Sequence, residues 1–474
     1  MADNWIVLKF GGTSVAGRRQ WETVASLVGA RRCEGYRVLL VCSAAAGVTN
    51  RLAALAADPG NGALPTEILD IHRTLGRDLA VDESAWLNEA VAYLQCSLEE
   101  LQAEPGPKPT AGLLAVGEWL STKIGAAFLA QSMETTWVDA RDLLRVVDEP
   151  GRAPARRWLS AACEPGVDPQ MGARWPDLFG GLASVIITQG FIARAPDGAT
   201  ALLGRGGSDT SAALLAGRLG AVRLEVWTDV PGLFSADPRL IEEARLLSAV
   251  DYDEALEMAA SGAKVIQSRS LRAAAATGTP VLIQDVNRRD LSGTRIGKEG
   301  SAYQGVKTIT CQQRMAVLLL ENLDHRHQVG FLAEVFGIFS RRGLSVDLVA
   351  TSETTTTVAL NIEANHLPAE DLAALVAELS GRCRVKLFDD CVCVNLVGRG
   401  VRTALCRLQE VMSFFERRPL LMLSQSANDL CLSLLVESGD HEELLRAAHR
   451  ALIPSGDETG GGVFAASWTR IRAL

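Results

Sequence analysis

Two glycine-rich stretches with charged residues at their edges contain the residue types in this sequence that could perform chemistry. The first reads Lys9-Phe10-Gly11-Gly12-Thr13-Ser14, and the second reads Gly204-Arg205-Gly206-Gly207-Ser208-Asp209. Glycines let backbone N–H groups approach an anionic ligand, and a lysine ammonium supplies a compact charge for phosphate. Together with aspartates on predicted loops, they fit nucleotide-dependent phosphoryl transfer, which depends on positioning and charge neutralisation. The same residues also build tight turns that bind nothing, so spacing alone leaves that alternative open.

The elements around these stretches are predicted to place them at one edge of a sheet. Residues 5–8 form an apolar run typical of a buried strand, and residues 20–30 carry an apolar helical face. Further strands are predicted at 38–42, 184–192, 225–229 and 281–283, with helices within 51–103 and at 210–219 and 253–260. This alternation indicates an α/β fold with a largely parallel sheet, in which ligand-binding loops gather at the carboxyl ends of the strands. After a predicted break at 105–109, a helix is expected to open at Gly117, where Glu118 could simply complement the helix dipole.

After residue 300 the pattern changes to strand–helix–strand–strand–helix–strand, and it then nearly repeats. The first copy has predicted strands at 315–320, 345–351, 356–362 and 384–388, with helices around 332–339 and at 368–379. The second copy has predicted strands at 391–396, 420–424 and 430–436, with helices at 402–415 and 441–452. The second copy lacks its last strand, which residues 306–311 could supply. The sequence therefore predicts an internal repeat with one unit threaded inside the other.

Composition narrows the class of protein. The chain has 474 residues, too many for one ordinary domain, and 22% charged with 48% hydrophobic residues describe a globular protein with ample core. Its formal net charge of -9 argues against nucleic acid as a main partner. No apolar stretch is expected to approach the ~20 residues of a membrane span, and no signal peptide is recognised. The 10 cysteines form no C-x-x-C pair, which predicts reduced thiols in the cytoplasm, and no residue cluster predicts a metal site.

Several catalytic motifs are missing from the sequence. There is no Walker loop, no protein-kinase catalytic loop and no G-x-G-x-x-G dinucleotide signature. No Ser–His–Asp or Cys–His arrangement is readable either. These absences favour direct phosphoryl transfer over a covalent enzyme intermediate.

Further motifs make the sequence similar to a known family. Ser43…Gly47-x-Thr49-Asn50, Gly117-Glu118-x-x-Ser121, Trp227 to Gly232 and Gly262-Ala263-Lys264 occur with the two glycine-rich stretches in the order seen in aspartate kinases. The resemblance covers residues 5 to about 295, whereas related amino-acid kinases share only fragments of the set. It implies that residues 1–300 form a catalytic domain with the amino-acid-kinase fold, a three-layer αβα arrangement around a largely parallel sheet.

Residues 306–455 resemble the tandem, nested ferredoxin-like ACT domains of aspartate kinases. The first would span about 314–390, and the second about 306–312 plus 391–453. Residues 330–337 and 345–353 are similar to the lysine-inhibited type. The resemblance implies effector-binding residues, namely His325, Gly330, Phe331, Leu332, Val346, Asp347, Ser352 and Glu353. Residues 456–474 are a predicted linker or tail; with the irregular segment 148–182 they also resemble the kinase half of fused aspartate kinase–diaminopimelate decarboxylases.

The resemblance implies transfer of the ATP γ-phosphoryl group, with Mg²⁺, to the β-carboxylate of L-aspartate, giving 4-phospho-L-aspartate for lysine, threonine and methionine synthesis. It assigns catalysis to Lys9 and Asp209. It assigns aspartate binding to Ser43, Thr49, Glu118 and Arg205. It assigns nucleotide binding to Gly11, Gly12, Ser14, Thr228, Asp229, Phe234, Arg239 and Lys264. ACT pairs commonly associate across subunits, so a homodimer or homotetramer is expected.

Three departures from the family pattern bear on these expectations. Phe234 stands where the family often has Tyr, and Gln267-Ser268 stand where it often has His-Pro. His325 stands where Met is common in lysine-inhibited enzymes, and a protonated imidazole would disfavour a cationic lysine side chain. Lysine remains the predicted effector. Two alternatives stay open, namely a catalytically silent amino-acid sensor and a sibling kinase acting on another carboxylate.

Overall fold

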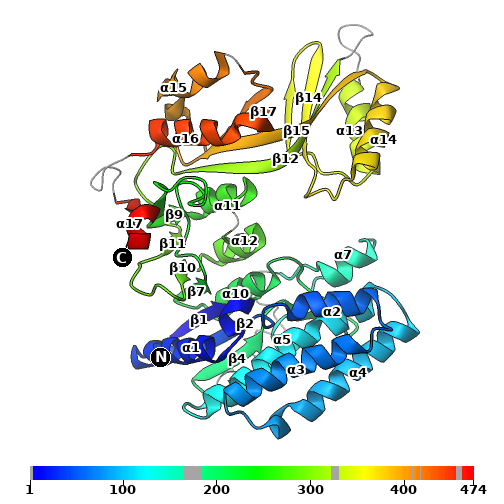
Figure 1. Ribbon diagram of the computed structural model, residues 1–474, viewed down its shortest axis with the longest axis vertical. Helices are drawn as coiled ribbons and strands as arrows, with labels where there is room; N and C mark the ends of the chain where they lie inside the picture. The colour runs from blue at the N-terminus through cyan, green and yellow to red at the C-terminus, as the bar shows by residue number, and fades with distance from the viewer. Residues whose placement is uncertain are drawn as a thin grey trace. The chain divides into compact units, whose positions relative to one another are not determined.

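The computed structural model describes residues 4–164, 179, 183–263, 265–321, 330–407, 409–416, 418–454 and 462–473. The chain divides into two compact units (Figure 1). The first unit contains Met1–Leu233, Ser248–Tyr252 and Lys264–Gly300, and the second contains Phe234–Leu247, Asp253–Ala263 and Ser301–Leu474. The second unit therefore includes two segments that precede residue 300, the predicted domain boundary.

The first unit is built on one eight-stranded sheet with the order β3-β4-β2-β1-β7-β10-β11-β9. Its strands are β1 (Trp5–Phe10), β2 (Arg37–Cys42), β3 (Thr135–Trp137), β4 (Val185–Gln189), β7 (Arg223–Thr228), β9 (Ala249–Asp251), β10 (Val281–Asp285) and β11 (Thr294–Gly297). Every neighbouring pair is parallel except β10 with β11. The predicted largely parallel sheet is confirmed.

Helices cover both faces of this sheet. They are α1 (Arg18–Cys33), α2 (Val48–Ala57), α3 (Ala63–Asp78), α4 (Leu87–Ala103), α5 (Pro107–Ala130), α10 (Gly207–Arg218) and α12 (Ser268–Thr277). Ile6 and Leu8 join a hydrophobic cluster with residues of α1 to α5. Because side chains alternate along a strand, Val7 points to the opposite face, where it is also fully buried. Two buried faces explain why β1 reads as a continuous apolar run.

Helix α5 corrects two expectations. It begins at Pro107, ten residues before the predicted start, because proline at the first helical position lacks only an N–H that would have no helical partner. Glu118 therefore lies in the middle of α5, where the dipole of a helix start does not reach it. By length and composition this one helix could cross a membrane, contrary to the expectation that no stretch would qualify, but 67% of its apolar window is buried inside the unit. Its hydrophobicity is accounted for by the core it occupies.

The second unit contains a six-stranded antiparallel sheet with the order β13-β14-β12-β15-β17-β16. Its strands are β12 (Thr308–Glu321), β13 (Leu348–Thr351), β14 (Thr355–Asn361), β15 (Arg384–Val397), β16 (Met422–Gln425) and β17 (Cys431–Glu437). β12 and β15 each join two predicted strands, and Thr308 at the start of β12 pairs with Val397 at the end of β15. The predicted threading of one repeat into the other is confirmed, with residues 308–312 completing the second copy.

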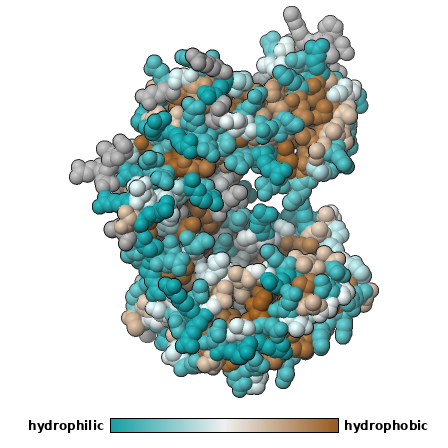
Figure 2. Space-filling view, viewed as in Figure 1, coloured by the Kyte–Doolittle hydropathy of each residue, from teal (hydrophilic) through white to brown (hydrophobic). Residues whose placement is uncertain are grey.

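Three regular helices accompany this sheet, α13 (Phe331–Arg341), α14 (Ala369–Ser380) and α16 (His441–Leu452). The helix predicted at 402–415 is wrong. The described residues there form a 3₁₀ helix (Val401–Arg407), one short α-helical turn, α15 (Gln409–Met412), and a second 3₁₀ helix (Ser413–Glu416). Apolar residues also reach the surface of this unit, since Leu332 and Val349 are 43% and 40% exposed. Figure 2 shows apolar surface over the region of α13 and β14.

The last described residues are part of the second unit. Strand β18 (Phe464–Ser467) pairs antiparallel with β8 (Arg245–Leu247), and helix α17 (Trp468–Ala473) follows it. The predicted tail is therefore folded from residue 463 onward, whereas the linker-like residues 455–461 lie outside the described ranges.

Candidate active site

The first glycine-rich stretch lies at the carboxyl end of a parallel strand of the first unit, whereas the second follows β6 (Thr200–Leu202), which pairs antiparallel with β5 (Ile192–Arg194) outside the large sheet. The 3₁₀ helix η1 (Gly12–Val15) follows β1, Ser43 follows β2, and Thr228 ends β7. β1 lies between β2 and β7, where the order of strands in the sheet reverses direction. Loops at such a switch point diverge and leave room for a ligand.

A nearly buried ion pair links the two glycine-rich stretches. Lys9 Nζ lies 2.6 Å from Asp209 Oδ1, and the two side chains are 11% and 13% exposed. Lys9 is the penultimate residue of β1, and Asp209 lies in the first turn of α10. The residue before α10, Gly206, has φ +66°, a conformation that favours glycine. The arrangement holds a lysine ammonium beside two loops rich in backbone N–H groups.

The first glycine-rich stretch packs tightly against the loop after β2. Ala46 N donates a hydrogen bond of 3.1 Å to Gly12 O. A Cβ added to Gly12 would lie 2.7 Å from Ala44 O, so only glycine permits this approach. Ser14 Oγ is buried and has no hydrogen-bond partner in the part of the chain that the structure describes. A buried hydroxyl in this position is available to a ligand.

Glu118 is a buried acid without a matching cation in the part of the chain that the structure describes. It is 4% exposed, and its Oε2 has no hydrogen-bond partner among the residues described. Burial raises the pKa of Glu118 to about 8, although the backbone N–H of Ala44 donates to the carboxylate and partly opposes this rise. Because a buried acceptor without a partner is costly, the position fits a carboxylate that binds a cationic ligand group.

Hydroxyl groups tie Glu118's helix to the neighbouring loops. Ser121 Oγ donates to Ser43 O at 2.7 Å, and Ser43 Oγ donates to Ser208 Oγ at 3.0 Å. A Cβ on Gly190 would lie 2.5 Å from Ser208 Cβ, which explains the glycine after β4. Sequence reasoning gave Ser121 and Ser208 no role, although both lie inside the recognised motifs.

Other predicted residues of the first unit lie on the same loops. Arg205 is exposed, and within the described chain it makes no hydrogen bond or ion pair. Thr49 is half-buried in the first turn of α2. Thr228 Oγ1 donates to Asp229 Oδ1 at 3.1 Å, and Asp229 is exposed. In the described ranges no group of three or more His, Cys, Asp or Glu residues is arranged to hold a metal ion.

The remaining predicted nucleotide residues lie elsewhere or cannot be placed. Phe234 and Arg239 belong to the second unit, where Arg239 pairs with Asp237 at 2.7 Å. Lys264 and His325 lie outside the described residues.

The other predicted effector residues all belong to the first copy of the repeat. Gly330, Phe331 and Leu332 lie at the start of α13, and Ser352 and Glu353 lie between β13 and β14. Val346 packs against the same hydrophobic cluster as Phe331. Asp347 Oδ2 accepts a hydrogen bond of 2.7 Å from Asn361 N.

The chain is similar to known proteins of one family. The Amino acid kinase family matches residues 4–285. The chain is 32% identical to the lysine-sensitive aspartokinase 3 of Escherichia coli (strain K12), over 94% of this chain and 99% of that protein. The crystal structure of E. coli aspartokinase III in complex with aspartate and ADP (R-state) matches with a TM-score of 0.78 and 31% identity, covering 95% of this chain and 100% of that chain.

A second state of the same enzyme is also similar. The crystal structure of E. coli aspartokinase III in complex with lysine and aspartate (T-state) matches with a TM-score of 0.76 and 30% identity, covering 95% of this chain and 99% of that chain. The shared length includes both units and both glycine-rich stretches. The chain therefore belongs to the aspartokinases, within the amino acid kinase family.

Proposed function

We propose that this aspartokinase transfers the γ-phosphoryl group of ATP to the β-carboxylate of L-aspartate. The observation that carries the proposal is the buried Lys9–Asp209 pair beside a glycine cradle, with Glu118 buried on α5. Oε2 of Glu118 has no hydrogen-bond partner among the described residues. The complex of the E. coli relative with aspartate and ADP supports the choice of substrates.

Glu118 and Arg205 are the proposed recognition groups for aspartate. The substrate ammonium would supply the cation that Glu118 lacks, which favours the ionised carboxylate. Arg205 can donate two hydrogen bonds to the α-carboxylate, because its exposed guanidinium has no competing partner in the described chain. Ser43 and Thr49 would line the same pocket. This pair of charges selects an amino acid over a neutral or purely anionic acceptor.

Lys9 is the proposed catalytic cation, held in place by Asp209. An oxygen of the β-carboxylate attacks the γ-phosphorus, the bond from that phosphorus to the β,γ-bridging oxygen breaks, and ADP leaves. Charge spreads over the transferring oxygens in the transition state, so a fixed ammonium stabilises it. The N–H groups of Gly11 and Gly12 and the hydroxyl of Ser14 are proposed donors to the same phosphates.

The rest of the nucleotide is proposed to contact Thr228, Asp229, Phe234, Arg239 and Lys264. Magnesium ions in kinases are usually held by one or two carboxylates and the nucleotide phosphates, so a site with few acidic ligands fits this cation. Asp209 is the proposed protein contact of phosphate-bound Mg²⁺, which would neutralise phosphate charge. These proposed roles follow from the resemblance to aspartate kinases.

The nested repeat within the second unit is the proposed regulatory part. We assign residues 1–300 to catalysis and the nested repeat, residues 306–455, to binding an amino acid, with lysine as the effector because the E. coli relative is lysine-sensitive. Asp347 offers a carboxylate suited to a cationic side chain. The exposed Leu332 and Val349 support association into a homodimer or homotetramer through this unit. All 10 cysteines are free, which supports a reducing, cytoplasmic setting for this enzyme of amino-acid biosynthesis.

Trapping the acyl phosphate with hydroxylamine tests the proposal. With ATP, Mg²⁺ and L-aspartate, the wild type is expected to form hydroxamate, and millimolar L-lysine is expected to suppress it. Lys9→Met should lower the rate by about 100-fold or more, the scale for removing one electrostatic contact to the transition state. Lys108→Met is the matched control, since Lys108 is an exposed lysine paired with Asp197. No hydroxamate from protein that still binds ATP would instead support an amino-acid sensor.

A further inference from the structure

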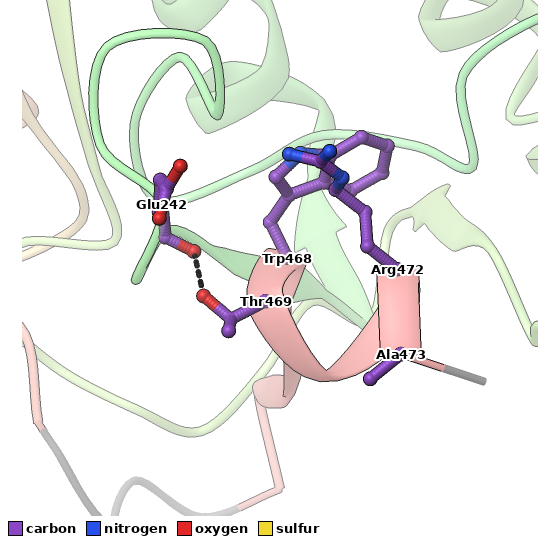
Figure 3. Close-up of a pocket in the computed structure, with 5 residues that line it drawn as sticks. All are labelled: Glu242, Trp468, Thr469, Arg472 and Ala473. Carbon is purple, nitrogen blue, oxygen red and sulfur yellow. Dashed lines mark hydrogen bonds between the residues drawn. The ribbon is translucent and has the colours of Figure 1, made fainter.

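The segment after residue 462 is bound to the stretch that contains the proposed nucleotide residues Phe234 and Arg239. Trp468 N donates to Ala244 O at 2.8 Å, and Thr469 Oγ1 donates to Glu242 O at 2.8 Å. Figure 3 shows this second hydrogen bond, with α17 lying along the backbone near Glu242. All of these residues belong to the second unit.

Arg245 holds the start of this segment and also Pro454, which precedes it in the chain. The residue is 5% exposed. Its guanidinium donates to three carbonyl oxygens, at 3.1 Å to Pro454, 2.9 Å to Phe464 and 3.0 Å to Ala465. Hydrogen bonds from a charged donor are stronger than neutral ones. The segment is therefore held by a buried cation in addition to the β8–β18 strand pairing.

The side chain of Trp468 reaches Phe234 itself. The two rings meet edge to face, with centroids 5.6 Å apart and planes at 88°. The backbone at Phe234 is held from another side, because Phe234 O accepts from Thr308 Oγ1 at 2.7 Å and Ser235 O accepts from Ile309 N at 2.8 Å. Strand β12 thus fixes the main chain, and Trp468 contacts the ring.

We propose that Trp468 is a positioning residue for nucleotide binding, and that the segment of β18 and α17 acts by ordering the Phe234 ring. The inference rests on the proposed function, since it requires that Phe234 and its loop contact the nucleotide. Without Trp468 the ring gains freedom that nucleotide binding must then remove, and ordering a side chain on binding lowers affinity. Aspartate binds to the other unit's residues, so its binding is left unchanged.

A second edge-to-face pair in the same unit provides the matched control. Tyr303 and Phe464 have ring centroids 5.3 Å apart at 78°, so Tyr303→Ala also deletes one ring of such a pair. Tyr303 packs on β18 without a ring contact to Phe234 among the described pairs. A general loss of stability should therefore appear in both variants, and a loss of nucleotide affinity in only one.

Calorimetric titration of the full chain with MgADP tests the inference, together with KM values for ATP and aspartate. Trp468→Ala is expected to weaken MgADP binding and raise KM for ATP by about 2- to 10-fold, the factor that one aromatic pair corresponds to. KM for aspartate should stay at the wild-type level in Trp468→Ala. In Tyr303→Ala, MgADP affinity and both KM values should stay at the wild-type level. Trp468→Phe keeps a ring at the site and should recover most of the affinity, and it also serves if the alanine variant does not fold.

Phe234→Ala separates the two ways in which the inference could fail. If it weakens MgADP binding and Trp468→Ala does not, the positioning role is wrong while the proposed nucleotide contact stands. If Phe234→Ala leaves MgADP affinity unchanged, the proposed nucleotide role of Phe234 is wrong and the inference falls with it. Equal losses of MgADP affinity in Trp468→Ala and Tyr303→Ala would show that Trp468 acts only through the stability of the fold.

Discussion

Glu118 should make the stability of this enzyme fall as the pH rises, and Glu118→Gln should remove that effect. Burial raises the pKa of Glu118 from 4.5 to about 8. A carboxyl whose pKa is raised by folding stabilises the folded state fully below its unfolded pKa, and this contribution is lost as the pH rises through the folded pKa. Between these limits the unfolded chain ionises readily while the folded protein must keep the proton.

The size of the effect follows from the two pKa values. At about 1.4 kcal/mol per pH unit, the interval from 4.5 to about 8 corresponds to an upper bound of about 5 kcal/mol. From the linkage between proton binding and folding, roughly half of this free energy of unfolding, about 2.5 kcal/mol, is lost between pH 6 and pH 8.5. Urea unfolding at these two pH values should therefore show the wild type losing more free energy of unfolding than Glu118→Gln, by about that amount.

Glu89→Gln is the matched control, because Glu89 is an acid with a 63% exposed side chain. It should follow the wild-type pH dependence. The reasoning about Glu118 is refuted if the wild type and Glu118→Gln lose the same free energy of unfolding between the two pH values. The same carboxyl predicts that aspartate binding strengthens from pH 6 to pH 8.5, because the substrate ammonium pairs with the ionised form.

Three further changes test other parts of the structure. Arg205→Ala should raise KM for aspartate roughly 10- to 100-fold, the range for a charged hydrogen-bonded pair. Because Arg205 is exposed, the melting temperature of this variant should equal that of the wild type. A lower melting temperature would argue for a structural role. Gly12→Ala should lower kcat/KM by at least about 10-fold, because the loop must shift to relieve a 2.7 Å approach of the new Cβ to Ala44 O. Gly29→Ala is the control: its Cβ would meet nothing within 4 Å, and kcat/KM should stay at the wild-type value. Lys307→Met removes the ammonium that lies 2.7 Å from the Glu254 carboxylate, and both side chains are at most 1% exposed. Because a buried charge is then left unpaired, the free energy of unfolding should fall by about 3–5 kcal/mol. A fall below about 1 kcal/mol in urea unfolding would contradict this expectation.

The strongly patterned elements were predictable from the sequence. β1 is a run of buried residues that includes Lys9 and is followed by two glycines, and both the strand and the position of the glycines follow from local pattern. The threaded repeat was predictable for the same reason, because each copy repeats its order of elements. The resemblance to aspartate kinases then implied the proposed role of each glycine-rich stretch.

Elements that depend on distant contacts were not predictable. The start of α5 at Pro107 does not follow from the sequence, because proline fits the first position of a helix as well as it fits a loop. The hydrogen bonds of Arg245 do not follow from the sequence either. They join its guanidinium to the carbonyl oxygens of Pro454, Phe464 and Ala465, about 200 positions later in the chain. No local pattern records such pairings, since only the folded chain brings their carbonyl oxygens to one guanidinium.

Gln267 shows how a departure from a family pattern acquires a physical meaning. In the sequence, Gln267 stands where aspartate kinases often have a histidine, near the predicted nucleotide site. In the structure it precedes α12 and covers Gly206, where an added Cβ would lie 2.0 Å from Gln267 Cγ. Gly206 has a left-handed backbone conformation and lies between Arg205 and the first turn of α10, which contains Asp209. We therefore expect a change at position 267 to act on catalysis by moving this glycine, and with it the proposed aspartate-binding arginine and the carboxylate that holds Lys9.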